Sequence, residues 1–208
     1  MNDSEKITGS LALKPKPRII TIPATGQDLT RPLRVAAYAR VSSDSNDQLH
    51  SYAAQTAYFA KLINSNPNWI FAIIDVSKMN ADMVKEYEVL LLGTSTWGDG
   101  ELQDDWYDGV KVLKESDLKE KTIALFGCGD AESYCDTFCD GMGIIYEDIK
   151  DSGCTIVGKV SAKDYSFSSS IAVIDGMFVG LALDDINESD KTEERIDAWV
   201  NDIKNHLA

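Results

Sequence analysis

Residues 89–100 read VLLLGTSTWGDG, an apolar run that ends in a glycine-rich turn carrying one tryptophan. Residues 122–134 read TIALFGCGDAESY and follow the same plan, with Tyr134 as the aromatic. Short apolar runs that end in glycine are typical of buried strands in a parallel sheet. Two such turns at the ends of neighbouring strands could hold a flat ring on both faces, so both turns are candidate parts of a ligand site.

Apolar runs alternate with helical patterns along most of the chain. We expect strands at residues 35–39, 70–74, 89–92 and 122–126, and a fifth strand in two pieces, 155–160 and 178–183, separated by an insertion with a hairpin at Asp175-Gly176. Helical spacing predicts helices over 49–63 and 103–114. A third helix should open at Tyr134 and bury Phe138, Met142, Ile145 and Ile149. A last helix should follow Ser189-Asp190 and bury Ile196, Trp199, Val200, Ile203 and Leu207. This alternation predicts an α/β fold whose parallel sheet is covered by helices on both faces, with ligands at the carboxyl ends of the strands.

Composition limits the classes of function. The 208 residues suffice for one α/β domain, and the net charge is −14 although residues 1–40 hold seven Lys/Arg against three Asp/Glu. The acidic charge of the remaining residues disfavours binding to nucleic acid and favours association with basic proteins. No apolar run approaches the roughly 18 residues of a membrane span, so we expect no membrane association. Four cysteines and two histidines without metal-ligand spacing indicate no metal site and a reducing, cytoplasmic location.

Residues 1–32 differ from the rest of the chain because prolines interrupt regular structure there. We expect an extended or disordered arm over 1–32, with at most a short edge strand at 19–22. Residues 33–208 should then form the single folded domain.

From about Asp75 to the end, the chain resembles a long-chain flavodoxin. The resemblance is carried by residues 94–103 after the third strand, by 126–130 with Tyr134 after the fourth, and by 180–185. It implies a flavodoxin-like, doubly wound, five-stranded parallel sheet of order 2-1-3-4-5, with strand 5 interrupted by an insertion. It also implies FMN as the cofactor and a low-potential carrier of single electrons between redox partner proteins, a role of electron transfer rather than enzymatic catalysis.

The same resemblance implies which residues bind FMN. Trp97 and Tyr134 would stack on opposite faces of the isoalloxazine, and a peptide flip at Gly98 would favour the one-electron-reduced flavin. Acidic neighbours at Asp99, Glu101 and Asp130 would lower the potential for the last electron. The full set implied for the two loops is Thr94, Ser95, Thr96, Trp97, Gly98, Cys128, Gly129, Asp130, Tyr134 and Thr137.

Residues 18–72 resemble a different family, the serine recombinases or resolvases. Residues 33–42 read LRVAAYARVS, which looks like the start of such an enzyme, and the resemblance implies Ser42 as the nucleophile supported by Arg40. We therefore expect a chimera with a junction near residues 73–76, in which 33–74 supplies the first strand, helix and strand of the flavodoxin-like domain.

The loop after the first strand would meet the FMN phosphate. It offers Ser42, Ser43 and Ser45 as donors, but Asp44 and Asp47 would repel a dianion, which predicts weaker FMN binding than in an intact flavodoxin. Two alternatives remain open: a serine recombinase fragment acting in DNA binding or strand exchange, and a non-functional chimera. The basic partners expected for the first reading are reductases or ferredoxin-dependent enzymes.

Overall fold

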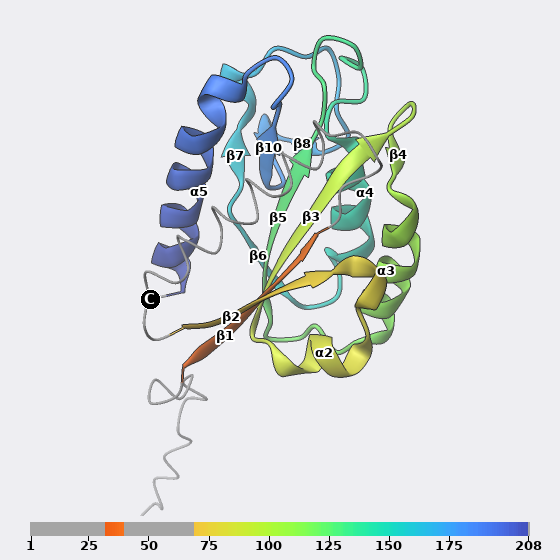
Figure 1. Ribbon diagram of the computed structural model, residues 1–208, viewed down its shortest axis with the longest axis vertical. Helices are drawn as coiled ribbons and strands as arrows, with labels where there is room; N and C mark the ends of the chain where they lie inside the picture. Colours follow the sequence, from red (N-terminus) through yellow and green to blue (C-terminus); the bar gives the residue numbers. More distant parts are fainter. Residues whose placement is uncertain (1–31, 40–68, 208) are drawn as a thin grey trace, which may run out of the picture. The chain divides into compact units, whose positions relative to one another are not determined.

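The computed structural model describes residues 32–39 and 69–207, which belong to one compact unit, Arg31–Ala208 (Figure 1). The expected edge strand at 19–22 and the expected helix at 49–63 lie outside the described residues.

The central sheet has the predicted order. Its main path runs β10-β5-β3-β1-β2, and every pairing along this path is parallel. In the numbering of the expected strands this is the order 2-1-3-4-5, so the flavodoxin-like topology is confirmed. The bounds are β1 Leu33–Ala39, β2 Trp69–Asp75, β3 Val89–Trp97, β5 Thr122–Cys128 and β10 Leu181–Leu183.

Two central strands are longer than the sequence predicted. β3 continues through the first half of the expected loop to Trp97, and β5 continues to Cys128. The extension arises because the strands stay paired beyond the apolar runs, with Thr94 opposite Gly127 and Ser95 opposite Cys128. Polar residues at the ends of these strands were therefore mistaken for loop.

The fifth strand is interrupted as expected. β6 (Thr155–Val157) pairs with residues 122–124 of β5, and β10 pairs with residues 126–128 of the same strand. The insertion between them forms a small antiparallel sheet of β7 (Val160–Ser161), β9 (Met177–Phe178) and β8 (Val173–Ile174), in that order. The predicted hairpin is present: β8 and β9 pair around Asp175 and Gly176, which both have positive φ, 53° and 76°.

Helices cover both faces of the sheet (Figure 1). α3 (Asp104–Glu115) and α4 (Asp140–Ile149) lie on one face, and α5 (Thr192–His206) lies on the other. A short helix that the sequence did not predict, α2 (Ala81–Glu86), follows β2 and is capped by the Asn80 side chain, which accepts from Met83 N. α4 begins at Asp140, six residues after the expected start at Tyr134, because Cys139 adopts a left-handed conformation with φ of 59°. Phe138 is buried but lies outside the helix.

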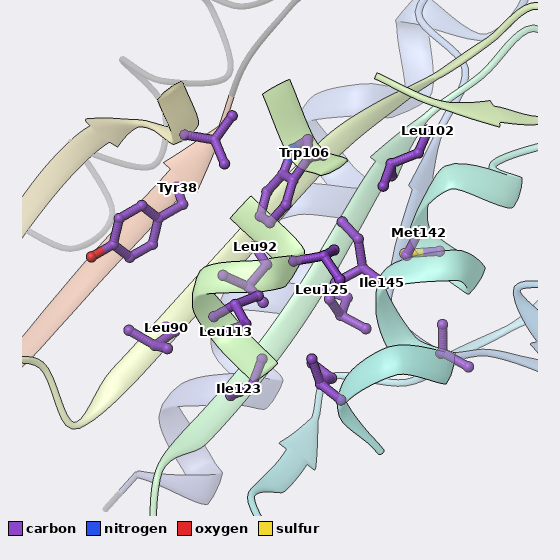
Figure 2. Packing of buried hydrophobic residues seen from close by; sticks show 14 of the residues in the cluster. Tyr38, Leu90, Leu92, Leu102, Trp106, Leu113, Ile123, Leu125, Met142 and Ile145 are labelled. Carbon is purple, nitrogen blue, oxygen red and sulfur yellow. The ribbon is translucent and has the colours of Figure 1, made fainter. Parts of the chain in front are cut away.

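Each face of the sheet has its own apolar core. On the α3/α4 side the cluster includes Trp106, Leu113, Met142 and Ile145 packed on β1, β3 and β5 (Figure 2). On the α5 side, the residues predicted for the buried helix face, Ile196, Trp199, Val200 and Ile203, are buried against β-strand residues such as Phe126. Leu207, also predicted to be buried there, is only partly buried. Within the described part of the chain, no helix has both the length and the apolarity to cross a bilayer.

Candidate functional site

The tryptophan turn is a tight hairpin at the carboxyl end of β3. Trp97 pairs with Glu101 of β4 (Glu101–Leu102), so the chain reverses over Gly98, Asp99 and Gly100. Gly100 N donates to the carbonyl of Trp97 at 3.1 Å. Gly98 and Gly100 have φ of 48° and 97°, values that favour glycine. The turn therefore requires these glycines and presents an exposed backbone at Gly98.

The hydroxyl residues before the turn hold its geometry. Thr94 is buried and its hydroxyl donates to the carbonyl of Ser95 at 3.0 Å. The indole Nε1 of Trp97 donates to Ser95 Oγ at 3.1 Å, which fixes the orientation of the indole. Thr96 Oγ1 accepts from Gly141 N at 3.0 Å, so the hydroxyl proton of Thr96 remains available for a ligand.

The second loop begins at Gly129, directly after β5, and Asp130 organises it. Asp130 Oδ1 accepts from Ser133 N at 2.9 Å, from Glu132 N at 3.1 Å and from the side-chain amide of Asn187 at 2.9 Å. Burial acts to raise the pKa of Asp130, but these hydrogen bonds outweigh it and hold the pKa below its ordinary value. Asp130 is thus an ionised carboxylate whose lone pairs are used to shape the loop.

Tyr134 lies in a series of turns that precede α4, not at the start of a helix as the sequence suggested. The left-handed conformation of Cys139 is incompatible with a continuous α-helix from Tyr134, so α4 begins only at Asp140. Tyr134 N donates to the carbonyl of Asp130 at 3.0 Å, and Thr137 N donates to the carbonyl of Tyr134 at 3.2 Å. The tyrosine side chain is 52% exposed, which leaves its ring free for contact with another molecule.

The structure brings the two loops together at one edge of the sheet. The parallel register of β3 and β5 starts them side by side, with Ser95 opposite Cys128. Farther out, Thr137 approaches Gly100: a Cβ built on Gly100 would lie 3.1 Å from Thr137 Cβ. Thr137 of the second loop is therefore a neighbour of Gly100 in the tryptophan turn. The two loops thus lie next to each other at the carboxyl ends of β3 and β5.

Two residues of this region that the sequence analysis did not select are Asp184 and Asn187, just after β10. Asp184 is 1% exposed, and its carboxylate accepts from Ala131 N at 3.0 Å and from Asn187 N at 3.0 Å. The Asn187 amide then bridges Asp184 and Asp130, at 2.9 Å to each. The sequence could have indicated Asp184, because this aspartate directly follows the apolar strand Leu181–Leu183. A carboxylate that is buried at such a position requires hydrogen-bond partners.

The residues expected at the phosphate end, Ser42, Ser43 and Ser45, lie outside the described residues, as does Arg40. The described part of the chain reaches this region only at Ala39, the last residue of β1, which pairs with Gly93 of β3. Because β1 and β3 are parallel, β1 ends at the same edge of the sheet as the two loops.

The chemistry of this edge fits a flat, aromatic, electron-accepting group. Trp97 is half-buried and Tyr134 half-exposed, so both rings keep surface for stacking. Gly98 and Gly129 add backbone that a ring can approach closely. Asp99, Glu101, Glu132 and Asp136 are exposed around the loops, and neither 93–110 nor 122–149 contains Lys or Arg. The site is therefore strongly acidic at its rim.

Comparisons with known proteins give matches to flavodoxins. A family model described as Flavodoxin matches residues 56–199. Flavodoxin 1 of Azotobacter vinelandii is 46% identical over 121 residues, which cover 57% of this chain and 69% of that protein. Flavodoxin 1 of Escherichia coli (strain K12) is 42% identical over 134 residues, covering 64% and 76%. A crystal structure of Fusobacterium nucleatum flavodoxin bound to flavin mononucleotide matches with a TM-score of 0.73 and 25% identity, covering 84% of this chain and 98% of that one.

Proposed function

The chain belongs to the flavodoxin family, and from this we infer that it is an FMN-binding carrier of single electrons. The observation that carries this function is the junction of the two loops at one edge of the sheet, where β3 and β5 run in register up to Ser95 and Cys128. When bound, FMN would supply the one-electron chemistry. The protein would bind the ring, orient it and set the charge around it.

We propose that the isoalloxazine is held by Thr94, Ser95, Thr96, Trp97, Gly98, Cys128, Gly129, Asp130, Tyr134 and Thr137. Stacking on Trp97 and Tyr134 would provide most of the affinity at the ring end. The fixed indole of Trp97, bonded to Ser95 Oγ, supports this role because a preorganised ring loses little conformational freedom on binding. The backbone at Gly98 supports the expected peptide flip because its positive φ is one that glycine tolerates without strain.

Ser42, Ser43 and Ser45 are proposed to meet the phosphate. The position of Ala39 supports this, because β1 ends at the edge of the sheet that carries both loops. Asp44 and Asp47 in the same stretch place two negative charges near the phosphate. We therefore propose that FMN binds more weakly than in a flavodoxin whose phosphate loop has no carboxylates.

We propose basic redox proteins, such as reductases or ferredoxin-dependent enzymes, as partners, because the rim around the loops carries exposed carboxylates and no Lys or Arg in 93–110 or 122–149. Charge of one sign steers association with a partner of the opposite sign, and salt weakens it. The rate of electron transfer to a basic acceptor, such as cytochrome c, should fall as salt rises from about 10 to about 500 mM. None of the four cysteines, all of which lie in the described part of the chain, forms a disulfide, which supports the proposed cytoplasmic location.

The alternative is a serine recombinase fragment over residues 18–72, which would act through Ser42 and Arg40. The flavodoxin match begins at residue 56, inside that segment, and the comparisons give the recombinase function no support. Both of its candidate residues lie outside the described part of the chain. An absorbance spectrum of the purified protein with FMN tests the proposed function: a bound-flavin spectrum is expected. A colourless protein that retains DNA in a salt-dependent manner would favour the alternative, and a protein with neither property would be a non-functional chimera.

A further inference from the structure

Asp140, the first residue of α4, lies between the insertion and the tryptophan turn. Its side chain is buried, with 6% of the residue exposed. Oδ1 accepts a hydrogen bond from Ile171 N of the insertion at 2.9 Å, and the hydroxyl of Ser170 also bonds to the carboxylate. Burial raises the pKa of Asp140, and these hydrogen bonds offset that effect only in part. A carboxyl group with these partners has a defined position at the start of the helix.

The other oxygen of Asp140 faces the turn. A Cβ built on Gly100 would lie 3.1 Å from Asp140 Oδ2, which is tighter than ordinary van der Waals contact. The next helix residue, Gly141, continues the contact: its N donates to Thr96 Oγ1 at 3.0 Å, and a Cβ there would lie 3.1 Å from Ser95 O. The first turn of α4 therefore supports both the end of β3 and the hairpin turn that follows it.

The insertion packs on the same helix one turn later. A Cβ built on Gly143 would lie 2.8 Å from Ala172 N and 2.9 Å from Ile171 C, so the backbone of the insertion rests directly on α4. Ala172 is fully buried, and its carbonyl accepts from Val179 N at 2.9 Å. Residues 170–172 are thus fixed to the helix and, farther along the insertion, to the segment that leads into β10. Asp140 therefore lies between the insertion, to which it is hydrogen-bonded, and Gly100, beside which it leaves little room for a side chain.

From this arrangement we infer that Asp140 is a positioning residue that ties residues 170–172 of the insertion to the turn Trp97–Gly100 and so holds that turn in the shape that binds FMN. The inference rests on the proposed function for its consequence, FMN affinity. The link between residues 170–172, Asp140 and the turn is already present in the chain without FMN. The insertion therefore acts on the cofactor site through one carboxylate, without any residue of 170–172 having to touch the cofactor.

Amide hydrogen exchange at Gly100 tests the tie, measured by NMR on the full-length chain before FMN is added. The Gly100 amide donates to Trp97 O, so its exchange reports opening of the turn. Asp140→Ala removes the acceptor for Ile171 N and should speed exchange about tenfold, the effect of losing a hydrogen bond to a charged group. Asp140→Asn keeps an acceptor oxygen and should restore exchange to within about twofold of the unmodified chain.

Two further variants separate this role from a general loss of stability. Glu147→Ala removes an exposed carboxylate from the same helix, where it pairs with Lys150, and should leave Gly100 exchange unchanged. Gly143→Ala keeps the Asp140 carboxylate but pushes against Ala172 N and Ile171 C, so it displaces the Ile171 amide that donates to Asp140 and should also speed exchange. It also keeps the test decisive if Asp140→Ala does not fold. FMN titrations of the same proteins should show affinity falling about tenfold in Asp140→Ala and Gly143→Ala only.

Unchanged Gly100 exchange in a folded Asp140→Ala would overturn the inference, even if the unmodified chain binds FMN. If Asp140→Ala does not fold, unchanged exchange in Gly143→Ala would overturn it. So would failure of Asp140→Asn to restore exchange, because the hydrogen bond would then not be the link. Faster exchange in a chain that binds no FMN would keep the tie but overturn the proposed function and, with it, the consequence for the cofactor.

Discussion

The indole Nε1 of Trp106 donates a buried hydrogen bond of 2.8 Å to the carbonyl oxygen of Gly93. Trp106 is fully buried on α3, and Gly93 is the β3 residue at which the apolar run gives way to the polar strand end. This bond fixes α3 to the strand that carries half of the candidate site. It also satisfies the buried indole N–H, a donor that would cost free energy if it were left unpaired.

Trp106→Phe should therefore lower the free energy of unfolding by about 2 kcal/mol, since it removes the donor and leaves space beside the sheet. Urea unfolding followed by circular dichroism measures this. Tyr107→Phe is the matched control, because Tyr107 is the next residue of α3 and is 51% exposed. Equal stability of the Trp106 and Tyr107 variants would show that the indole bond contributes nothing.

Removal of either proposed stacking ring should weaken FMN binding. Trp97→Ala and Tyr134→Ala should each raise the dissociation constant about tenfold, because an aromatic contact with a flat ring contributes roughly 1–3 kcal/mol. Each variant should also raise the midpoint potential of the second one-electron step, since a stacked electron-rich ring disfavours added negative charge. Isothermal titration calorimetry and potentiometry measure the two effects. Tyr107→Ala, an exposed aromatic on α3, should change neither, and a loss of affinity in that variant would point to a different binding surface.

Two tyrosines, the buried Tyr38 and the half-buried Tyr165, should respond in opposite ways to loss of the hydroxyl. Tyr38 is fully buried on β1, and its hydroxyl has no hydrogen-bond partner among the described residues. Tyr165 donates its hydroxyl to the carbonyl of Ala182 at 2.9 Å. Tyr38→Phe should stabilise the protein and Tyr165→Phe should destabilise it, each by about 1 kcal/mol. Chemical unfolding of the two variants in parallel measures this, and a destabilised Tyr38→Phe would mean that the hydroxyl has a partner.

Alkaline pH should destabilise the protein partly through Tyr165. Burial raises the pKa of Tyr165 to about 12, although the Arg195 guanidinium over its ring acts to lower it. In the unfolded chain the phenol ionises near its ordinary value of about 10. The folded state therefore binds more protons between pH 10 and pH 12, and its stability is complete below that window and lost as pH rises through it.

Unfolding free energies at several pH values between about 9 and about 11.5 measure this loss. Tyr165→Phe should lose less stability across the range than the unmodified chain. Parallel pH profiles for the two proteins would contradict the assignment to Tyr165.

The sequence predicted the strands because each is a compact apolar run that ends at glycine or a polar turn, and the resemblance to flavodoxins predicted their order. The sequence did not predict α2, whose six residues are too few for a periodic pattern and whose best signal is the capping side chain of Asn80. It also placed Tyr134 at a helix start, since nothing in the residue order reveals that Cys139 is left-handed.

The candidate site was predicted in outline through the aromatics and glycines of the two loops. The residues that hold those loops in place were not. Asn187 bridges Asp130 across 57 positions of sequence, and Asp140 reaches Ile171 across 31. Such contacts depend on tertiary structure, and neither periodicity nor local motifs encode them.

Quenching of FMN fluorescence on titration with the purified protein tests the central claim most directly. Stacking on Trp97 and Tyr134 should quench the flavin to a saturating end point at an equimolar ratio. A Trp97→Ala/Tyr134→Ala double variant at the same concentrations should leave most of the fluorescence. Flavin fluorescence that stays unchanged with the protein in large excess would contradict the account.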